Sequence, residues 1–371
     1  MKIVRRVLPL LVAILSLRCT FAADVSALVD DLTDDKKRAT AIAELLKLGA
    51  AAEPDLKKIE LDKKMDERQL VIVRRLLGNI LINTTQLKPL DTSKLAPFGS
   101  DKEKNIEGDK TILIDPNPET RPKNKLIVLS AEFALEQGPL EYLVVSKGPN
   151  AKLHETVIAI DARPHDLCYA LLACEYVYAG ELDDQGAVTL PKDAGVLMSV
   201  EFEWETPNEK TGEPVPEAKA GEPQPLDPKP ETKPDEKPNP NKRLVRVPVE
   251  FFAFNLQTER EMKRVPFAFT GSKFDKDPQT GKMIFIADFE KSIAAVRLDP
   301  IAILNSPLNT RNINPLHANG YAVNWRCVPK RHTPCKLIFE PYTGPLLTDA
   351  DLTDTGDHKG EGIKTDWAPK K

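Results

Sequence analysis

One stretch of the sequence, residues 205–242, constrains the fold more than any other feature. It consists mainly of Pro, Glu, Lys, Asp and Thr, so it cannot bury enough surface to offset the entropy of ordering it and is predicted to stay extended and solvated. Apolar residues alternate on both sides of it: Val200, Phe202 and Trp204 before it, and Val245, Val247 and Val249 after it. Because these flanks look like two arms of one interrupted hairpin, we interpret the stretch as a loop inside one domain; an interdomain spacer is the alternative.

Residues 23–90 have the periodicity of helices. Three apolar runs recur at helical spacing: Val25, Leu28, Val29 and Leu32; Ala39, Ile42, Ala43, Leu45, Leu46 and Leu48; and Leu70, Val71, Val73, Leu76, Leu77 and Ile80. Gly49 follows the second run, where glycine commonly ends a helix. A set of positions in this region resembles a HEAT-type helical repeat: Leu32, Arg38, Ala41, Leu45, Gly49, Ala52, Pro54 and Leu56. A plain helical bundle is the alternative.

From about residue 105 the pattern changes to short β-branched or alternating runs separated by Pro, Gly and Asn turns. The expected strands are 111–114, 125–130, 140–146, 155–160, 196–204, 244–252, 265–269, 283–287, 293–297, 321–327 and 336–339. One helix begins at Pro164 and is apolar on nearly every side, which is typical of a buried helix. The sequence therefore predicts an α+β fold, with a small helical N-terminal region and a mostly antiparallel β-rich domain, 105–342. Residues 343–371 are predicted to be a disordered acidic tail.

The first residues have the three zones of a secretory signal peptide. Lys2, Arg5 and Arg6 precede an apolar run over residues 7–17, and Thr20-Phe21-Ala22 places small residues at the −3 and −1 positions of a cut after Ala22. The run is shorter than the roughly 20 residues that a spanning helix needs. We therefore expect residues 1–22 to be cleaved, leaving an exported chain, periplasmic or extracellular, with no membrane span. An uncleaved anchor and lipidation at Cys19 are the alternatives.

Charge excludes one class of partner. Of the 52 basic residues, four lie in the leader, and the chain has 56 acidic residues, so the mature chain carries a net charge of about −8. Nucleic-acid binding requires a basic face that neutralises phosphates, so no nucleic-acid partner is expected. The same balance gives no reason to expect an anionic membrane surface as partner.

Several ordered segments of the β-rich part together resemble one known domain. They are Leu140-Glu141-Tyr142-Leu143-Val144, Lys152-Leu153-His154-Glu155-Thr156, residues 161–172, Phe269-Thr270-Gly271-Ser272-Lys273-Phe274 and Asp299-Pro300-Ile301-Ala302-Ile303-Leu304. This set resembles the YdjY domain, which is found in many exported bacterial proteins, and the likeness covers residues 105–342. The resemblance implies export but no particular activity, because that family is essentially uncharacterised. The Pro-rich stretch, Cys327 and Cys335 depart from the family's pattern.

Four cysteines remain after cleavage: Cys168, Cys174, Cys327 and Cys335. Cys327 and Cys335 flank a short loop between two expected strands, so an oxidising compartment would allow a disulfide worth about 2–3 kcal/mol across the mouth of a hairpin. Cys168 and Cys174 would point about 120° apart on a helix and are expected to be buried free thiols.

Two alternatives for the cysteines imply chemistry. Cys327, His332 and Cys335 could hold a metal ion, but their spacing is not that of a structural zinc motif, so no metal site is predicted. His165 and Cys168 lie three residues apart near a helix N-terminus, where a thiol could become a nucleophile. We favour the interpretation that Cys168 belongs to the apolar side of the helix.

His154 and Glu155 are the candidate ligand-binding residues. They follow a Gly-Pro-Asn turn and lie in one of the segments that carry the resemblance. We expect them to open a strand, where neighbouring side chains point to opposite faces, so that they cannot work together as an acid–base pair. Structural hydrogen bonding is the alternative to ligand binding.

No catalytic residue and no cofactor is predicted, because the sequence lacks G-x-S-x-G, H-E-x-x-H, a phosphate-cradling glycine loop and a dinucleotide fingerprint. We therefore expect an exported non-catalytic binding or interaction module whose partner is an unknown protein or envelope component. The alternative is an enzyme or small-ligand-binding protein with its site near His154 and Glu155. That site would have to converge with polar groups such as Asp288 or Glu290, whereas a binding module would present an exposed apolar surface or a free strand edge.

Overall fold

The computed structural model describes residues 25–61, 65–99, 109, 111–180, 195–205, 242–277, 280–308, 320–345, 347–348 and 351–352. The predicted signal peptide lies outside the described residues, as do positions 206–241 and most of the tail, so the predictions for these segments stay predictions. Two compact units make up the chain: residues 1–85 with 204–243, and residues 86–203 with 244–371. None of the helices in the described part of the chain is long and apolar enough to cross a membrane.

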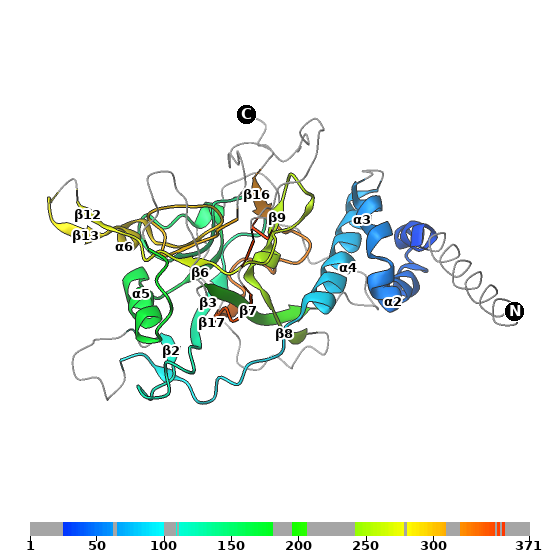
Figure 1. Ribbon diagram of the computed structural model, residues 1–371. Helices are drawn as coiled ribbons and strands as arrows, with labels where there is room; N and C mark the ends of the chain where they lie inside the picture. The colour runs from blue at the N-terminus through cyan, green and yellow to red at the C-terminus, as the bar shows by residue number, and fades with distance from the viewer. Residues whose placement is uncertain are drawn as a thin grey trace, which may run out of the picture. The chain divides into compact units, whose positions relative to one another are not determined.

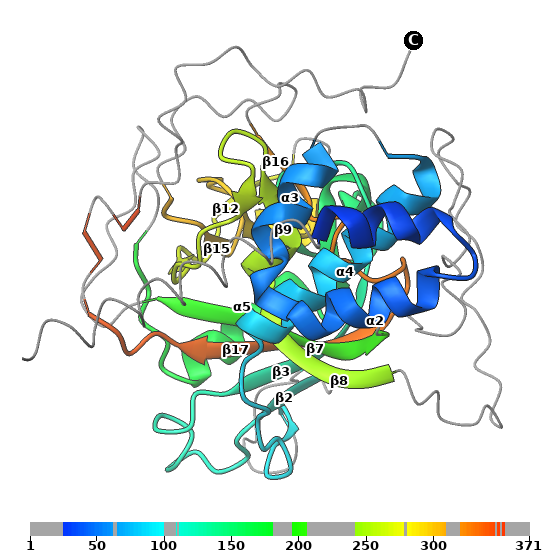
Figure 2. The ribbon, with the colours of Figure 1, turned by 90° about the vertical axis from the view of Figure 1, so that its right-hand side faces the viewer.

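The first unit is helical (Figures 1 and 2). A helix over residues 25–30 is followed by η1 (Asp31–Thr33), α2 (Arg38–Leu48), η2 (Gly49–Ala51), α3 (Glu53–Leu61) and α4 (Glu67–Thr85). All three predicted apolar runs contribute to one core, which includes Val29, Leu45 and Leu76. Gly49 ends α2 with a φ of 54°, which glycine adopts without strain. The helices are thus confirmed, although they end at Thr85, and the likeness to a HEAT-type repeat stays a prediction.

Three sheets form the second unit. The large sheet contains β1 (Ala96–Pro97), β2 (Ile112–Ile114), β3 (Ile127–Phe133), β5 (Tyr142–Ser146), β6 (Thr156–Ile160), β7 (Val196–Glu205), β8 (Lys242–Pro248), β11 (Ala268–Phe269), β14 (Ser292–Ala295), β15 (Leu304–Asn305) and β17 (Pro334–Pro341). A four-stranded sheet contains β4 (Pro139–Leu140), β9 (Ala253–Asn255), β10 (Arg260–Glu261) and β16 (Tyr321–Val323). The third sheet is the pair β12 (Phe274–Lys276) and β13 (Met283–Phe285).

The strand order confirms the α+β class. The large sheet runs β11-β15-β14-β5-β6-β3-β17-β7-β8, with β2 on β3 and β1 on β2. Its β5–β6 and β14–β15 pairs are parallel, whereas pairs such as β3–β17, β3–β6 and β5–β14 are antiparallel. Since β7 and β8 are neighbours, the two flanks of the Pro-rich stretch do lie side by side in one sheet, as predicted.

Two predicted strand assignments are wrong at the corners of the unit. The segment predicted as a strand over 244–252 leaves the sheet at Pro248 and continues as a short 3-10 helix, η4 (Val249–Phe252). The segments around 321–327 and 336–339 do not form a hairpin, because β16 belongs to the four-stranded sheet and β17 to the large one. The first error arises because apolar residues continue past Pro248 although the strand ends there, and the second because alternation of apolar residues identifies a strand but not the strand that pairs with it.

The predicted helix at Pro164 is α5 (Pro164–Ala173), with proline in its first turn. It packs against β2 and against α6 (Ile286–Glu290), and its buried side includes Leu167 and Leu171. The prediction that it is buried on nearly every side is wrong, because Tyr169 and Leu172 are each 48% exposed. Figure 1 shows α5, α6 and the β12–β13 pair at the same end of the second unit.

Candidate functional site

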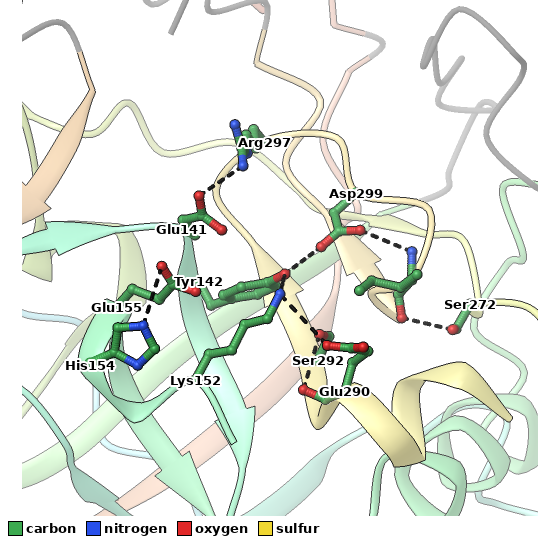
Figure 3. Close-up of polar contacts among 11 residues, drawn as sticks. Glu141, Tyr142, Lys152, His154, Glu155, Ser272, Glu290, Ser292, Arg297 and Asp299 are labelled. Atoms are coloured by element: carbon green, nitrogen blue, oxygen red, sulfur yellow. Dashed lines mark hydrogen bonds and ion pairs between the residues drawn. The ribbon is translucent and has the colours of Figure 1, made fainter. Parts of the chain in front are cut away.

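A polar cluster surrounds the side chain of Tyr142 (Figure 3). Tyr142 opens β5 and is only 2% exposed. Its hydroxyl donates a hydrogen bond to Asp299 Oδ2 at 2.5 Å and accepts one from Lys152 Nζ at 2.9 Å. The antiparallel β5–β14 pair brings these residues together, because Ala295 of β14 lies opposite Tyr142 and the chain reaches Asp299 four residues later.

The side chain of Lys152 lies over the ring of Tyr142. Its ammonium nitrogen lies 4.9 Å from the ring centroid and 3.9 Å from Glu290 Oε2. The Lys152 side chain is 26% exposed and that of Glu290 is 31% exposed, so this ion pair lies at the surface and contributes little to stability. Lys152 therefore links the buried phenol to solvent.

Asp299 stabilises the loop that follows β14 through hydrogen bonds within the loop. Its Oδ1 accepts a hydrogen bond from the amide of Ile301 at 3.0 Å, and its own amide donates to Asn305 Oδ1 at 2.6 Å. Ser272 holds the same loop from another segment, because its hydroxyl donates to the carbonyl of Ile301 at 2.7 Å. The carboxylate of Asp299 thus has a partner on each oxygen.

Burial keeps the phenol of Tyr142 protonated. Loss of water raises the pKa of the Tyr142 hydroxyl well above its ordinary value, and the negative charge of Asp299 raises it further. A tyrosinate nucleophile or base would need the opposite shift, so the arrangement favours a hydrogen-bonding role for Tyr142.

His154 and Glu155 lie at the edge of this cluster. They belong to the 3-10 helix η3 (Leu153–Glu155) and not to β6, so their predicted placement on opposite faces of a strand is wrong. The two side chains turn toward each other, with Nε2 of His154 and Oε2 of Glu155 3.9 Å apart. The His154 side chain is 80% exposed and that of Glu155 20%. Burial and then the charge of Glu141 raise the pKa of Glu155.

Asp288 and Glu290, the two carboxylates expected to converge with His154 and Glu155, make contacts in different places. Glu290 reaches the cluster through Lys152, but Asp288 accepts a hydrogen bond from the amide of His165 at 2.9 Å, at the start of α5. Arg297 forms an ion pair with Glu141, with 2.9 Å between Nη2 and Oε1. The polar groups around His154 therefore pair mostly with one another.

None of the four described cysteines forms a disulfide, so the structure does not contain the predicted Cys327–Cys335 bridge, which stays a prediction. Cys327 lies in the turn that follows β16, with its sulfur directed at the carbonyls of Phe251 and Asn324, both at 3.6 Å, whereas Cys335 is on β17. Cys168 and Cys174 are not bridged either; Cys174 is buried as predicted, whereas Cys168 is only partly buried.

Three of the cysteines also have thiol pKa values that are too high for a nucleophile. Burial raises the pKa of Cys168 to about 12, and it raises the pKa values of Cys327 and Cys335 as well. A reactive thiolate needs a lowered pKa, so His165 and Cys168 do not form an activated pair. Among the described residues, no group of three His, Cys, Asp or Glu side chains is placed to hold a metal ion.

A second feature is an exposed apolar surface, which we name the aromatic surface and define by His165, Tyr169, Leu172, Phe274, Met283 and Phe285. Phe274 is 64% exposed and Met283 is 60% exposed. The register of β12 and β13 places Phe274 opposite Phe285 and Lys276 opposite Met283, so these four side chains share one face of the strand pair.

The aromatic surface is continuous from the strand pair to α5. The ring of Phe285 lies 5.2 Å from that of Phe274 and 6.5 Å from that of His165, measured between centroids. His165 in turn stacks edge-on against Tyr169 at 4.5 Å. Leu172 follows Tyr169 by three positions, which places it on the same face of the helix.

Sequence reasoning named His154 and Glu155 and missed Tyr142, Lys152 and Asp299, which hold the polar cluster together. The available signal was that all five lie in segments that carry the resemblance to one domain family. No known protein family, curated protein or solved structure matches the chain. The resemblance to the YdjY domain therefore stays a prediction.

Proposed function

We propose that the chain is an exported, non-catalytic binding module of the YdjY type, periplasmic or extracellular, that recognises a partner protein or another envelope component through the aromatic surface. One observation carries the proposal: large apolar side chains of Tyr169, Leu172, Phe274 and Met283 are each between 48% and 64% exposed and form one continuous face. Contiguous exposed apolar surfaces are unusual on soluble proteins unless a partner covers them.

The aromatic surface also has the composition of a binding site. Tyr, Phe and Met are enriched where proteins meet, because they bury much area and lose little side-chain entropy. The strand pair adds a second means of recognition. The hydrogen bonds Ile286 N to Lys273 O and Asp277 N to Lys282 O lie between β12 and β13, so the backbone groups of Phe274 and Lys276 point away from β13, toward an edge with which no other described strand pairs.

Catalysis by the polar cluster is the weaker candidate. Its central phenol is buried and stays protonated, and its two best-placed carboxylates, Glu141 and Asp299, are already engaged by Arg297 and Tyr142. Glu155, with its raised pKa and its neighbour His154, is the observation that favours a ligand-binding site there.

Site-specific photo-crosslinking tests the proposal. A photoreactive phenylalanine analogue replaces Phe274 in one variant and His154 in a second, in the chain carrying its own leader and produced in its native cells. Leu244 is the matched control, because it is 58% exposed and lies outside the aromatic surface.

We expect a discrete crosslinked product from position 274 and none from position 244. A crosslinked product from position 154 alone would show that the partner binds at the polar cluster and would refute the aromatic surface as the contact. Identical patterns from 274 and 244 would show that exposure alone explains the crosslink, and would contradict the proposal equally.

A further inference from the structure

The 3-10 helix η4 is the corner at which the chain leaves one sheet and enters another. It begins directly after β8, at the end of the large sheet, and leads directly into β9 of the four-stranded sheet. Asn324 holds this corner: its amide donates to the carbonyl of Phe252 at 2.7 Å, and its side-chain amide donates to that of Phe251 at 2.9 Å. The corner is therefore one of the covalent links between the two sheets; Glu141, between β4 and β5, is another.

Glu250 lies in the middle of this corner with its carboxyl group inside the protein. The residue is 1% exposed, and neither carboxyl oxygen has a hydrogen-bond partner among the described residues. Two positions later, Phe252 packs edge-on against Phe133 and Phe202, so the corner belongs to an aromatic core. An ionised carboxylate at such a place lacks water, and the nearby amides of Glu250 and Val265 offset only part of that loss, so the charge is costly.

The charged groups around Glu250 do not provide a counter-charge inside the corner. Arg264 acts on it electrostatically but is itself exposed to solvent. On β10 and next to β16, Glu261 and Arg326 lie 3.7 Å from each other, so their charges offset. On the β8 side, Arg246 pairs with Glu340, and Cys327 beside Phe251 stays a neutral thiol because burial raises its pKa.

We infer that the η4 corner is a pH-operated hinge: it closes over Glu250 when the carboxyl group is neutral and opens to water when the group is ionised. Burial raises the pKa of Glu250 from its usual 4.5 to about 7, although Arg264 and the amides of Glu250 and Val265 favour the charged form. The opening equilibrium therefore depends on pH between about 4.5 and 7.

The direction follows from proton linkage. The closed corner holds its proton up to about pH 7, whereas an open, hydrated carboxyl group releases it near 4.5. Raising the pH through this interval therefore favours opening, and below it the closed corner carries no penalty. For this pair of pKa values, the open-to-closed ratio rises about 30-fold between pH 5.5 and pH 8.

Hydrogen exchange of the whole chain, corrected for the intrinsic effect of pH on exchange, tests this hinge. In the wild-type protein we expect protection of the amides in 249–255 and 321–325 to fall about 30-fold between pH 5.5 and pH 8. The core strands β3 and β17 serve as the internal reference and should keep their protection. In Glu250→Gln, which cannot ionise, the corner should show no such fall, and Glu119→Gln, at an exposed site, should behave as the wild type.

Two results would overturn the hinge. The first is wild-type protection at the corner that is independent of pH, or that falls equally in β3 and β17. The second is the same pH dependence in Glu250→Gln as in the wild type, which would assign the titration to another group. The wild-type comparison between corner and core decides the matter even where the variant folds poorly.

Discussion

Replacing Tyr142 by Phe removes one oxygen atom from the middle of the polar cluster and leaves the ring in place. That oxygen donates to Asp299 at 2.5 Å and accepts from Lys152 at 2.9 Å, and the residue is 2% exposed. The ring still packs against Val145 and Ala302. A hydrogen bond to a charged group contributes about 1.5–3 kcal/mol, so we expect Tyr142→Phe to lower the free energy of unfolding by about 2 kcal/mol.

Urea unfolding followed by tryptophan fluorescence measures this loss. Tyr169→Phe is the matched control, because Tyr169 is 48% exposed and its hydroxyl makes no hydrogen bond to another described residue. The control should change the free energy of unfolding by less than about 0.5 kcal/mol. A double-mutant cycle with Asp299→Asn isolates the pair and should give a coupling energy of about 1 kcal/mol or more. A coupling energy near zero would refute the reasoning.

The same variant should also change the alkaline limb of the stability curve. Burial and the charge of Asp299 raise the pKa of folded Tyr142 above its ordinary value of 10.0, so the unfolded chain releases that proton first as the pH rises. Wild-type stability therefore falls above pH 10, whereas Tyr142→Phe lacks this contribution. The difference in stability between the two proteins should shrink between pH 9 and pH 11.

Three further measurements probe the rest of the second unit. Gly271 has a φ of +74°, and an added Cβ would lie 2.9 Å from the ring of Tyr178, so Gly271→Ala should cost at least about 1 kcal/mol in thermal unfolding. Asp288→Ala leaves the amide of His165 without its acceptor and should cost about 1 kcal/mol, whereas Asp288→Asn should restore most of it. Thiol titration of the denatured, unreduced chain should count four thiols after cleavage at Ala22; a count of two would indicate the Cys327–Cys335 bridge, and five an uncleaved leader with Cys19.

Local signals in the sequence were sufficient for the elements and for the class of fold. Pro164 in the first turn of α5 and the positive φ of Gly49 at the end of α2 are properties of single residues, so a sequence reports them directly. The alternating valines of β8 and the apolar alternation of β7 were likewise sufficient to place the two strands side by side, because the Pro-rich stretch between them cannot contribute to a core.

Contacts between distant segments were not predictable in the same way. The Cys327–Cys335 bridge was inferred from two strands that are consecutive in sequence, but β16 pairs with β9 in the four-stranded sheet whereas β17 lies in the large sheet, and the sulfur of Cys327 is directed toward Phe251. The exposure of Tyr169 and Leu172 was missed for a related reason. Apolar residues on every side of a helix indicate burial in most proteins, but here part of that apolar surface belongs to a face shared with β12 and β13.

The polar cluster shows why a resemblance can predict a fold and leave activity open. Tyr142 and Asp299 are 157 residues apart in sequence and meet because β5 and β14 pair, and Ser272 and Lys152 then secure the loops on either side. Each of these residues has a structural reason to be where it is, since the loop that begins at Asp299 would otherwise lose its hydrogen-bond acceptors. Residues selected for holding two distant strands together carry no information about a partner. The information about a partner lies instead in side chains that the fold does not need, and Phe274 and Met283, exposed on a two-stranded ribbon, are the clearest of these.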